Sequence, residues 1–219
     1  MSKKVKRLYD EFKPTNYKIE LSPDKEQMKF TGTVVINGKK LGRPSKRITF
    51  HQKDLKIKSF RVYKLTKQIE EAVNIDRVNN HSGLDEVRFH SGQLIYPGDY
   101  RLEIEFEGKI TKNMNGMYPC NFTHRGKNKS IIATQFESHH AREVFPCIDE
   151  PEAKATFDLT LNVKQNETVL SNTPVFNSIA NGELKKVSFE TTPIMSTYLL
   201  AFVYGEMDYR ESKTKSDIK

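Results

Sequence analysis

Strict alternation of apolar and polar residues is the feature that most limits how this chain can fold. In "YRLEIEFEGKI", residues 100–110, the apolar side chains of Tyr100, Leu102, Ile104 and Phe106 alternate with charged ones. Successive side chains of a β-strand point to opposite faces, so this pattern predicts an antiparallel strand with one buried face. Shorter alternations of the same kind recur at residues 16–21, 28–36, 46–50, 55–63, 72–78, 85–90, 156–163 and 185–190.

Turn-forming residues separate these alternations at short intervals. Short strands at such spacing predict an all-β fold, with a saddle-like or sandwich arrangement of mainly antiparallel sheets. We interpret residues 65–73 as the arm of a hairpin. The nearly continuous apolar run at residues 197–209 is typical of a strand buried on both faces. Since no linker or internal repeat interrupts the chain, residues 1–219 are predicted to form a single domain.

Composition indicates a globular chain without a membrane segment. With 36% hydrophobic and 29% charged residues, the chain has enough apolar surface to fold around a core. No run approaches the roughly 18 apolar residues of a membrane span, and the start "MSKKVKRLYDEF" lacks the apolar part of a secretory signal. We therefore expect a cytoplasmic protein. Its two cysteines, Cys120 and Cys147, are expected to be reduced, with a bridge as the alternative.

The net charge raises the question of an acidic partner. The chain has 36 Lys and Arg against 28 Asp and Glu, a formal charge of +8, and such an excess suits phosphate binding. Many lysines nevertheless alternate with apolar residues, as in "DLKIKSF", which is typical of a solvated sheet face. Nucleic acid is therefore the less favoured partner. A free-standing basic β-domain that binds an acidic protein or nucleic acid stays as the alternative interpretation.

The alternation breaks between residues 133 and 161, where chemically reactive side chains gather. We predict a short helical turn near residues 138–145, capped by Ser138 and confined by Pro146 and Pro151. Irregular loops held between strands are a common place for function. The reactive side chains of this loop are Glu137, His139, His140, Glu143, Cys147, Asp149 and Glu150.

The residues of this loop do not by themselves indicate a catalytic centre. His140 and Glu143 would share one face of a turn, but neither HExxH nor HxxEH is present and a third metal ligand is missing, so no metal site is predicted. Cys147 lies next to two carboxylates, which raise the pKa of a thiol and make it a poor nucleophile. Asp149 and Glu150 are interpreted as turn residues that cap loop amides rather than as an acid and base pair.

Two motifs together resemble a known family. The order "TQFE...AREVFPCIDEPEAKATFDLTL", followed by "TTPIMSTYLLAFVYGEMDY", resembles the amino-terminal domain of the aminopeptidase N family of zinc metallopeptidases. The earlier segments "NYKIELSPD", "FTGTVVI", "ITFHQKDLKI", "YRLEIEFEGKI" and "NGMY" are similar to the same domain, so the resemblance covers essentially the whole chain. It implies a saddle-shaped, largely antiparallel β domain that precedes a thermolysin-like catalytic domain.

The resemblance also implies roles for two residues of the "TQFE" motif. Glu137 matches the acidic residue that binds the free α-amino group of the substrate, and Gln135 matches the polar residue that lines the first subsite. An exopeptidase must recognise a chain end, and a protonated amine with a pKa of about 8 is found only there. Without the resemblance, both residues would be read as solvated positions at a strand end. The loop scaffold would be Arg142, Phe145, Pro146, Asp149, Glu150 and Pro151.

The catalytic motifs of the family are not found in this sequence. No "GAMEN"-like segment follows "GEMDY", and no HExxH helix is present, so we expect zinc only in the full-length enzyme and no catalytic residue in this chain. The chain alone is expected to be inactive. Its expected partners are peptide amino termini and the missing catalytic domain. We expect an expressed domain of a longer aminopeptidase, with a naturally short relative as the alternative.

Overall fold

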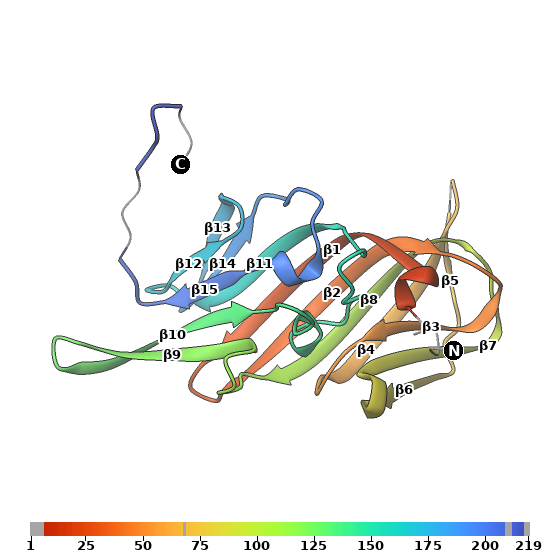
Figure 1. Ribbon diagram of the computed structural model, residues 1–219, viewed down its shortest axis with the longest axis horizontal. Coiled ribbons are helices and arrows are strands. Elements are labelled where there is room, and N and C mark those ends of the chain that lie inside the picture. The colour runs from red at the N-terminus through yellow and green to blue at the C-terminus, as the bar shows by residue number, and fades with distance from the viewer. Residues whose placement is uncertain (1–6, 68, 209–211, 217–219) are drawn as a thin grey trace, which may run out of the picture.

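The computed structural model describes residues 7–67, 69–208 and 212–216, and β-strands make up most of them (Figure 1). This confirms the predicted all-β class. The strands are β1 (Phe12–Asp24), β2 (Lys29–Lys40), β3 (Ser45–His51), β4 (Lys56–Leu65), β5 (Glu70–Ala72), β6 (Arg77–His81), β7 (Glu86–Ile95), β8 (Gly98–Lys109), β9 (Gly116–His124), β10 (Lys127–Gln135), β11 (Thr156–Lys164), β12 (Thr168–Ser171), β13 (Val175–Asn181), β14 (Leu184–Phe189) and β15 (Phe202–Gly205). Four 3-10 turns lie between them within the described ranges: η1 (Leu8–Asp10), η2 (Ser82–Leu84), η3 (Ala141–Glu143) and η4 (Thr197–Leu199).

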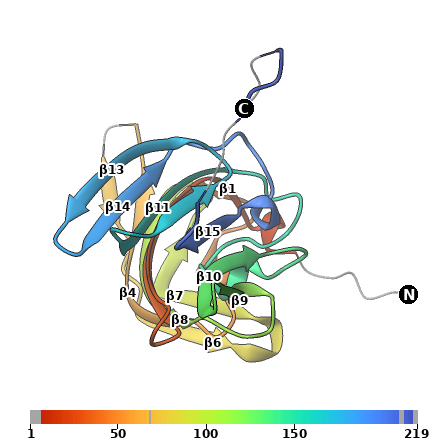
Figure 2. The same cartoon turned by 90° about the vertical axis from the view of Figure 1, so that its left-hand side faces the viewer.

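The strands form three sheets of different size. The largest has eight strands in the order β13-β14-β11-β1-β2-β8-β4-β5, the second has the order β12-β15-β10-β9, and the third has the order β3-β7-β6. Figure 2 shows the eight-stranded sheet as a curved wall with the smaller sheets on one side of it. The mainly antiparallel pairing and this curvature agree with the predicted saddle-like arrangement.

The core lies on the face of the large sheet that the alternation predicted to be buried. In β8, Tyr100, Leu102, Ile104 and Phe106 are all buried, whereas the charged residues between them reach the other face. The neighbouring strands β1, β2 and β11 contribute buried residues from the same face. A period-two pattern therefore locates both the strands and the core of this sheet.

One parallel pair brings distant parts of the chain together. β1 and β11 run parallel with Asn16 opposite Thr156 and Leu21 opposite Leu161. The Tyr17 ring of β1 stacks on the Phe157 ring of β11 at a centroid distance of 5.2 Å. Because β11 directly follows the loop of residues 136–155, this pairing fixes the end of that loop against β1.

The strand predicted at residues 72–78 was wrong. Residues 72–78 do not form one strand, because β5 ends at Ala72 in the large sheet and β6 begins at Arg77 in the three-stranded sheet. The hairpin predicted for residues 65–73 is confirmed in so far as β5 pairs with β4. Residue 68 lies outside the described residues.

The apolar run at residues 197–209 is not one strand buried on both faces either. Its first residues form η4, where the Thr197 hydroxyl donates to Asp149 Oδ1 at 3.2 Å and the Leu200 amide closes the turn on the Thr197 carbonyl. Leu199 is 49% exposed, and only Phe202–Gly205 becomes a strand. A polar contact with the loop thus overrides the apolar pattern, while Tyr209 lies outside the described residues.

Two further features bear on the sequence-based expectations. Every helical segment among the described residues is a three-residue turn, and none is long and apolar enough to cross a membrane. Both cysteines are free in the structure, with Cys147 buried and Cys120 partly buried.

Candidate functional site

The loop that follows β10 begins with an exposed pair of polar residues around a buried ring. Gln135 ends β10 opposite Gly116, and both Gln135 and Glu137 are exposed. Between them, Phe136 is buried, with ring centroids 6.2 Å from Phe145 and 6.5 Å from Phe202. The Phe136 ring therefore anchors this part of the loop in the core while its two neighbours face outward.

The polar groups of the exposed part are largely unused within the protein. The Glu137 amide donates to Gln135 Oε1 at 3.1 Å, which leaves the Gln135 Nε2 group as a donor. Among the described residues, none forms a hydrogen bond or an ion pair with the Glu137 carboxylate. The peptide bond between Glu137 and Ser138 is cis. The Glu137 carboxylate can therefore accept from a cationic hydrogen-bond donor, whereas the free Nε2 group of Gln135 can donate to an acceptor.

The predicted helical turn is present but short, and its predicted cap was wrong. It is the 3-10 turn η3, preceded by His140 with no side-chain cap, and Ser138 Oγ instead lies 2.8 Å from His139 Nδ1. The amide that a cap would serve is already bonded, because Arg142 N donates to Asp149 Oδ2 at 3.3 Å. A carboxylate seven residues downstream therefore replaces the local cap.

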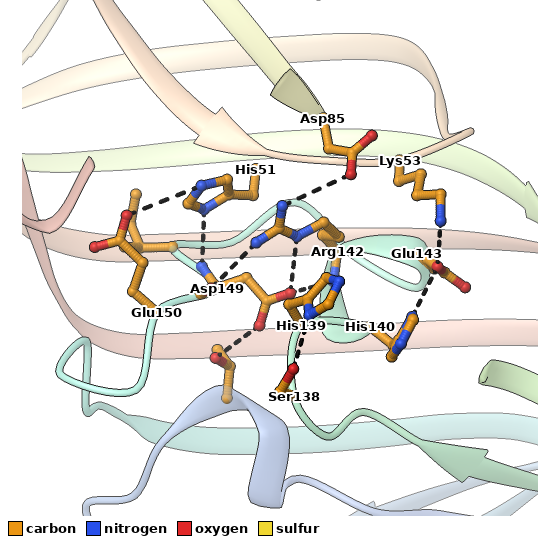
Figure 3. Close-up of polar contacts among 12 residues, drawn as sticks. His51, Lys53, Asp85, Ser138, His139, His140, Arg142, Glu143, Asp149 and Glu150 are labelled. Carbon is orange, nitrogen blue, oxygen red and sulfur yellow. Dashed lines mark hydrogen bonds and ion pairs between the residues drawn. The ribbon is translucent and has the colours of Figure 1, made fainter. Parts of the chain in front are cut away.

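Arg142 and Asp149 form the centre of the buried part of the loop (Figure 3). Arg142 Nε donates to Asp149 Oδ2 at 3.0 Å, Nη2 donates to the Asp149 carbonyl at 3.2 Å, and Nη1 lies 3.8 Å from Asp85 Oδ2. The Asp149 side chain is only 1% exposed, and this burial raises its pKa although Arg142 acts in the opposite direction. Such a pair is costly to break because either partner alone would be a buried, uncompensated charge.

His51, at the end of β3, holds the same segment from the other side. The backbones of His51 and Cys147 exchange hydrogen bonds of 2.8 and 3.1 Å, and Asp149 N donates to His51 Nδ1 at 3.0 Å. Burial, helped by the nearby Arg142 charge, lowers the pKa of His51 to about 3. His51 is therefore a neutral acceptor at physiological pH, as its bond to an amide requires.

Glu143 connects the turn to two neighbouring side chains, and these contacts occupy both His140 and the Glu143 carboxylate. Its Oε1 lies 2.9 Å from both Lys53 Nζ and His140 Nδ1. Burial alone would raise the pKa of Glu143, but these hydrogen bonds outweigh it and lower the pKa. Gly116 has a φ of +65°, and a Cβ there would lie 2.9 Å from Glu143 Oε2, so this position favours glycine.

Metal and thiol chemistry gain no support from these contacts. Within the described part of the chain, no three His, Cys, Asp or Glu side chains are grouped as metal ligands would be. His140 and Glu143 bond each other instead. Burial, followed by the charge of Asp149, raises the pKa of the Cys147 thiol well above its ordinary value, which suits a core residue and not a nucleophile.

Asp149 accepts from a loop amide, as expected, whereas Glu150 accepts from amides of η1 near the start of the chain. Besides the contact of Asp149 with Arg142 N, the Glu150 carboxylate accepts from the amides of Leu8 and Tyr9 at 2.9 and 3.3 Å. The remaining members of the scaffold were not identified from the sequence. They are His51, Lys53, Thr197 and Tyr17, whose hydroxyl accepts from Ile148 N at 3.0 Å. No local pattern marks them, since each lies far along the chain from the loop.

Comparisons with known proteins show to which family this chain is similar. Residues 13–199 match the model of the peptidase M1 N-terminal domain. The chain is 42% identical to an aminopeptidase N of Lactococcus lactis subsp. lactis, in an alignment that covers 99% of this chain and 24% of the relative.

Two eukaryotic relatives show the same pattern of coverage. Identity is 35% to aminopeptidase M1 of Arabidopsis thaliana, over 94% of this chain and 23% of the relative. Identity is 34% to a puromycin-sensitive aminopeptidase of Caenorhabditis elegans, over 99% of this chain and 23% of the relative. The chain thus spans about a quarter of the length of the curated relatives it matches.

Proposed function

This chain belongs to the family of peptidase M1 N-terminal domains, and from that premise we propose that it serves as the amino-terminal domain of a zinc-dependent aminopeptidase. In this role it contributes to the removal of residues from peptide amino termini. The proposal is supported by the names of its relatives, which are aminopeptidases, and by their alignment over nearly the whole chain.

The contribution of this domain would be recognition of the substrate α-amino group by Glu137. The observation that carries this proposal is an exposed carboxylate that has no bonding partner among the described residues, next to a side chain that is anchored in the core. A carboxylate already paired with a lysine or arginine would have to give up that bond before binding an amine. Glu137 has no such cost, and the buried Phe136 ring limits how far it moves.

Gln135 would line the first subsite beside the amine. Its Oε1 is held by the Glu137 amide, so its Nε2 donor is oriented by the same contact that fixes the backbone of Glu137. A charge-assisted hydrogen bond to Glu137 contributes about 1.5–3 kcal/mol in a partly desolvated site. Because the α-amino group has a pKa of about 8, this bond would weaken as the substrate loses its proton above that pH.

Zinc is not assigned to any residue of this chain. When bound in the whole enzyme it would activate water and polarise the scissile carbonyl. The described residues do not fit it, because no three His, Cys, Asp or Glu side chains among them are grouped as zinc ligands would be. Their two close His and carboxylate pairs are His140 with Glu143, which also binds Lys53, and His51 with Glu150. The chain would therefore bind and orient the peptide without cleaving it.

A chimeric enzyme tests this proposal. Residues 1–219 replace the matching quarter of the Lactococcus aminopeptidase N, and release of amino-terminal residues is measured with and without a zinc chelator. We expect zinc-dependent activity in the chimera and none in the isolated chain. A chimera that folds and binds zinc but releases no residue contradicts the domain assignment, and activity of the isolated chain contradicts its proposed inactivity.

A further inference from the structure

The three-stranded sheet contains more positive charge than its carboxylates can balance. Strands β3, β7 and β6 contain four lysines and arginines but one carboxylate, Glu86. Glu86 is already bonded to Arg88, whose Nε and Nη2 lie 2.7 and 2.6 Å from Glu86 Oε2. Asp76, directly before β6, accepts from Asn74 Nδ2 at 2.6 Å. The carboxylates of this region are thus bonded to other residues.

Two of the remaining charges lie in one row across the sheet. Arg47 of β3 and Arg77 of β6 are each the antiparallel register partner of His90 in β7. Side chains in such positions share one face of the sheet, with Cβ atoms about 5 Å apart. The next pair along, Ile48 and Phe89, is buried in the core. The row of arginines therefore lies on the outer face of the sheet.

The stability of the sheet does not explain this row. No hydrogen bond or ion pair joins the guanidinium of Arg47 or of Arg77 to another residue in the described part of the chain. Desolvation lowers the pKa of His90, and the charges of Arg77, Arg47 and Arg88 lower it further. Like charges that face each other across strands are destabilising. A bound anion would turn this repulsion into attraction.

A buried hydroxyl without a partner lies beside the row. Thr49 is two residues from Arg47 in β3, so its side chain shares the outer face, and it lies opposite Arg88. Thr49 is only 4% exposed, and its Oγ1 has no hydrogen-bond partner among the described residues. A buried hydroxyl without a hydrogen bond is destabilising, and a ligand that accepted from it would remove that cost.

These donors together fit an anion with more than two oxygens. The guanidiniums of Arg47 and Arg77, the Thr49 hydroxyl and a ring N–H of His90 can all donate. A carboxylate offers two oxygens, whereas a phosphate offers at least three, and guanidiniums bind phosphate through paired hydrogen bonds. The burial of Thr49 also favours a small anion over the broad surface of a macromolecule.

We propose that the outer face of the three-stranded sheet is a binding site for a small phosphate anion, either inorganic phosphate or a phosphomonoester. Arg47 and Arg77 bind it from the two sides of His90, and the Thr49 hydroxyl donates to an oxygen close to the sheet. This site goes beyond peptide recognition by the loop and does not depend on the proposed role of Glu137.

Isothermal titration calorimetry of the 219-residue chain with inorganic phosphate and with methyl phosphate, at constant pH and ionic strength, tests the proposal. Arg77→Gln removes an exposed guanidinium of the row. Arg125→Gln is the matched control, at an exposed residue in the turn of the β9–β10 hairpin, which extends away from β6 and β7 in Figure 1. Thr49→Val removes the unpartnered hydroxyl, so without phosphate it should be at least as stable as the parent.

We expect the parent and Arg125→Gln to bind at least one of the two phosphates with a dissociation constant of about 1 mM or below. Binding should weaken at least about tenfold in Arg77→Gln and at least about threefold in Thr49→Val. Acetate, with two oxygens, should bind the parent at least about tenfold more weakly than phosphate. Saturation by either phosphate with this pattern supports the site, and the tighter ligand identifies its source.

Four results would overturn the proposal. The first is the absence of saturable binding of both phosphates, and the second is an equal loss of affinity in Arg125→Gln. The third is acetate binding as tight as phosphate binding, because a protein carboxylate would then fit equally well. The fourth is phosphate binding by the chain but not by the folded Lactococcus chimera, which would mean that the rest of the enzyme covers the row.

Single-stranded DNA distinguishes a nucleic-acid surface from a site for a small anion. We expect Arg77→Gln and Arg125→Gln to affect DNA binding equally, because a general phosphodiester contact depends on net charge. DNA binding that requires Arg77, in a chain that binds neither small phosphate, would assign this face to nucleic acid and overturn the proposal.

Discussion

The two halves of the loop between β10 and β11 use the same kinds of side chain in opposite ways. From Gln135 to His139, the residues are exposed except for the Phe136 ring, and the Glu137 carboxylate has no partner among the described residues. From residue 140 to residue 150, the carboxylates are bonded to Arg142, to Lys53 or to backbone amides. One half leaves its charge available and the other uses its charges to hold the chain.

This difference indicates how an irregular loop becomes a precise binding site. A side chain that binds a ligand must keep an unsatisfied group, but its backbone must be fixed by groups that are fully satisfied. The difference between the two halves predicts different effects of substitution, which the residue types alone would not predict. Changes in the buried half should affect folding, whereas changes in the exposed half should affect only binding.

The largest expected effect is the loss of the buried guanidinium. Arg142→Met removes the partner of Asp149, whose side chain is 1% exposed, and should lower the free energy of unfolding by about 3–5 kcal/mol. Arg61→Met is the matched control, because the Arg61 side chain is 74% exposed and lies 3.8 Å from Glu103. Urea denaturation measures both. Similar losses of stability in the two variants would mean that the buried pair is not a scaffold.

A smaller effect is expected from a single hydroxyl beneath the loop. Tyr17→Phe leaves the buried Ile148 amide without its acceptor and should cost about 1–3 kcal/mol of stability. Tyr96→Phe, at a ring that is 53% exposed, should stay within about 0.5 kcal/mol of the parent. If thermal and urea unfolding do not separate the two variants, the hydroxyl of Tyr17 does not support the loop.

His51 predicts how the stability of the buried half depends on pH. Its folded pKa of about 3 lies below the unfolded value of about 6.5, so its contribution is complete above pH 6.5 and is lost as pH falls toward 3. Between these two pH values, His51 accounts for a change in the free energy of unfolding of up to about 1.4 kcal/mol per pH unit.

His51→Asn keeps an acceptor for Asp149 N but does not titrate, so it should flatten the acid side of the stability curve. His81→Asn, at an exposed histidine, should leave that slope unchanged. Urea midpoints measured between pH 4 and pH 7 compare the three proteins. An unaltered slope in His51→Asn would remove His51 from the buried scaffold.

The smallest expected effect on stability belongs to Glu137. Its exposed carboxylate has no bonding partner in the described chain, so Glu137→Gln should change the free energy of unfolding by less than about 0.5 kcal/mol. Thermal unfolding beside the parent checks this. A loss of stability comparable to that of Tyr17→Phe would mean that Glu137 belongs to the scaffold, which would contradict the distinction between the two halves of the loop.

The sequence predicted the parts of the molecule where burial alternates with exposure. β1, β2, β8 and β11 follow the period-two pattern because each has one face in the core. β13 escaped notice because all of its residues are exposed, and residues 72–78 were misread because the chain crosses there from one sheet to another. Alternation reports burial, so it fails where a strand is exposed on both faces or changes sheets.

In the candidate site, too, local contacts could be predicted from the sequence and distant contacts could not. Asp149 and Glu150 were recognisable as amide acceptors because carboxylates in a proline-bounded loop commonly cap backbone groups. The cap assigned to Ser138 was wrong because the turn begins later, at Ala141, where a tertiary contact from Asp149 satisfies the amide of Arg142. His51 and Tyr17 reach the loop from 98 and 131 residues away, and no local pattern encodes such contacts.

The most direct test of this account is the catalytic efficiency of Glu137→Gln in the Lactococcus chimera. Glu105→Gln, at an exposed carboxylate of β8, is the matched control. The account predicts that kcat/KM for release of an amino-terminal residue falls about 10- to 100-fold in Glu137→Gln, with unchanged stability, and is unaltered in Glu105→Gln. Equal kcat/KM in Glu137→Gln and the parent chimera would contradict it.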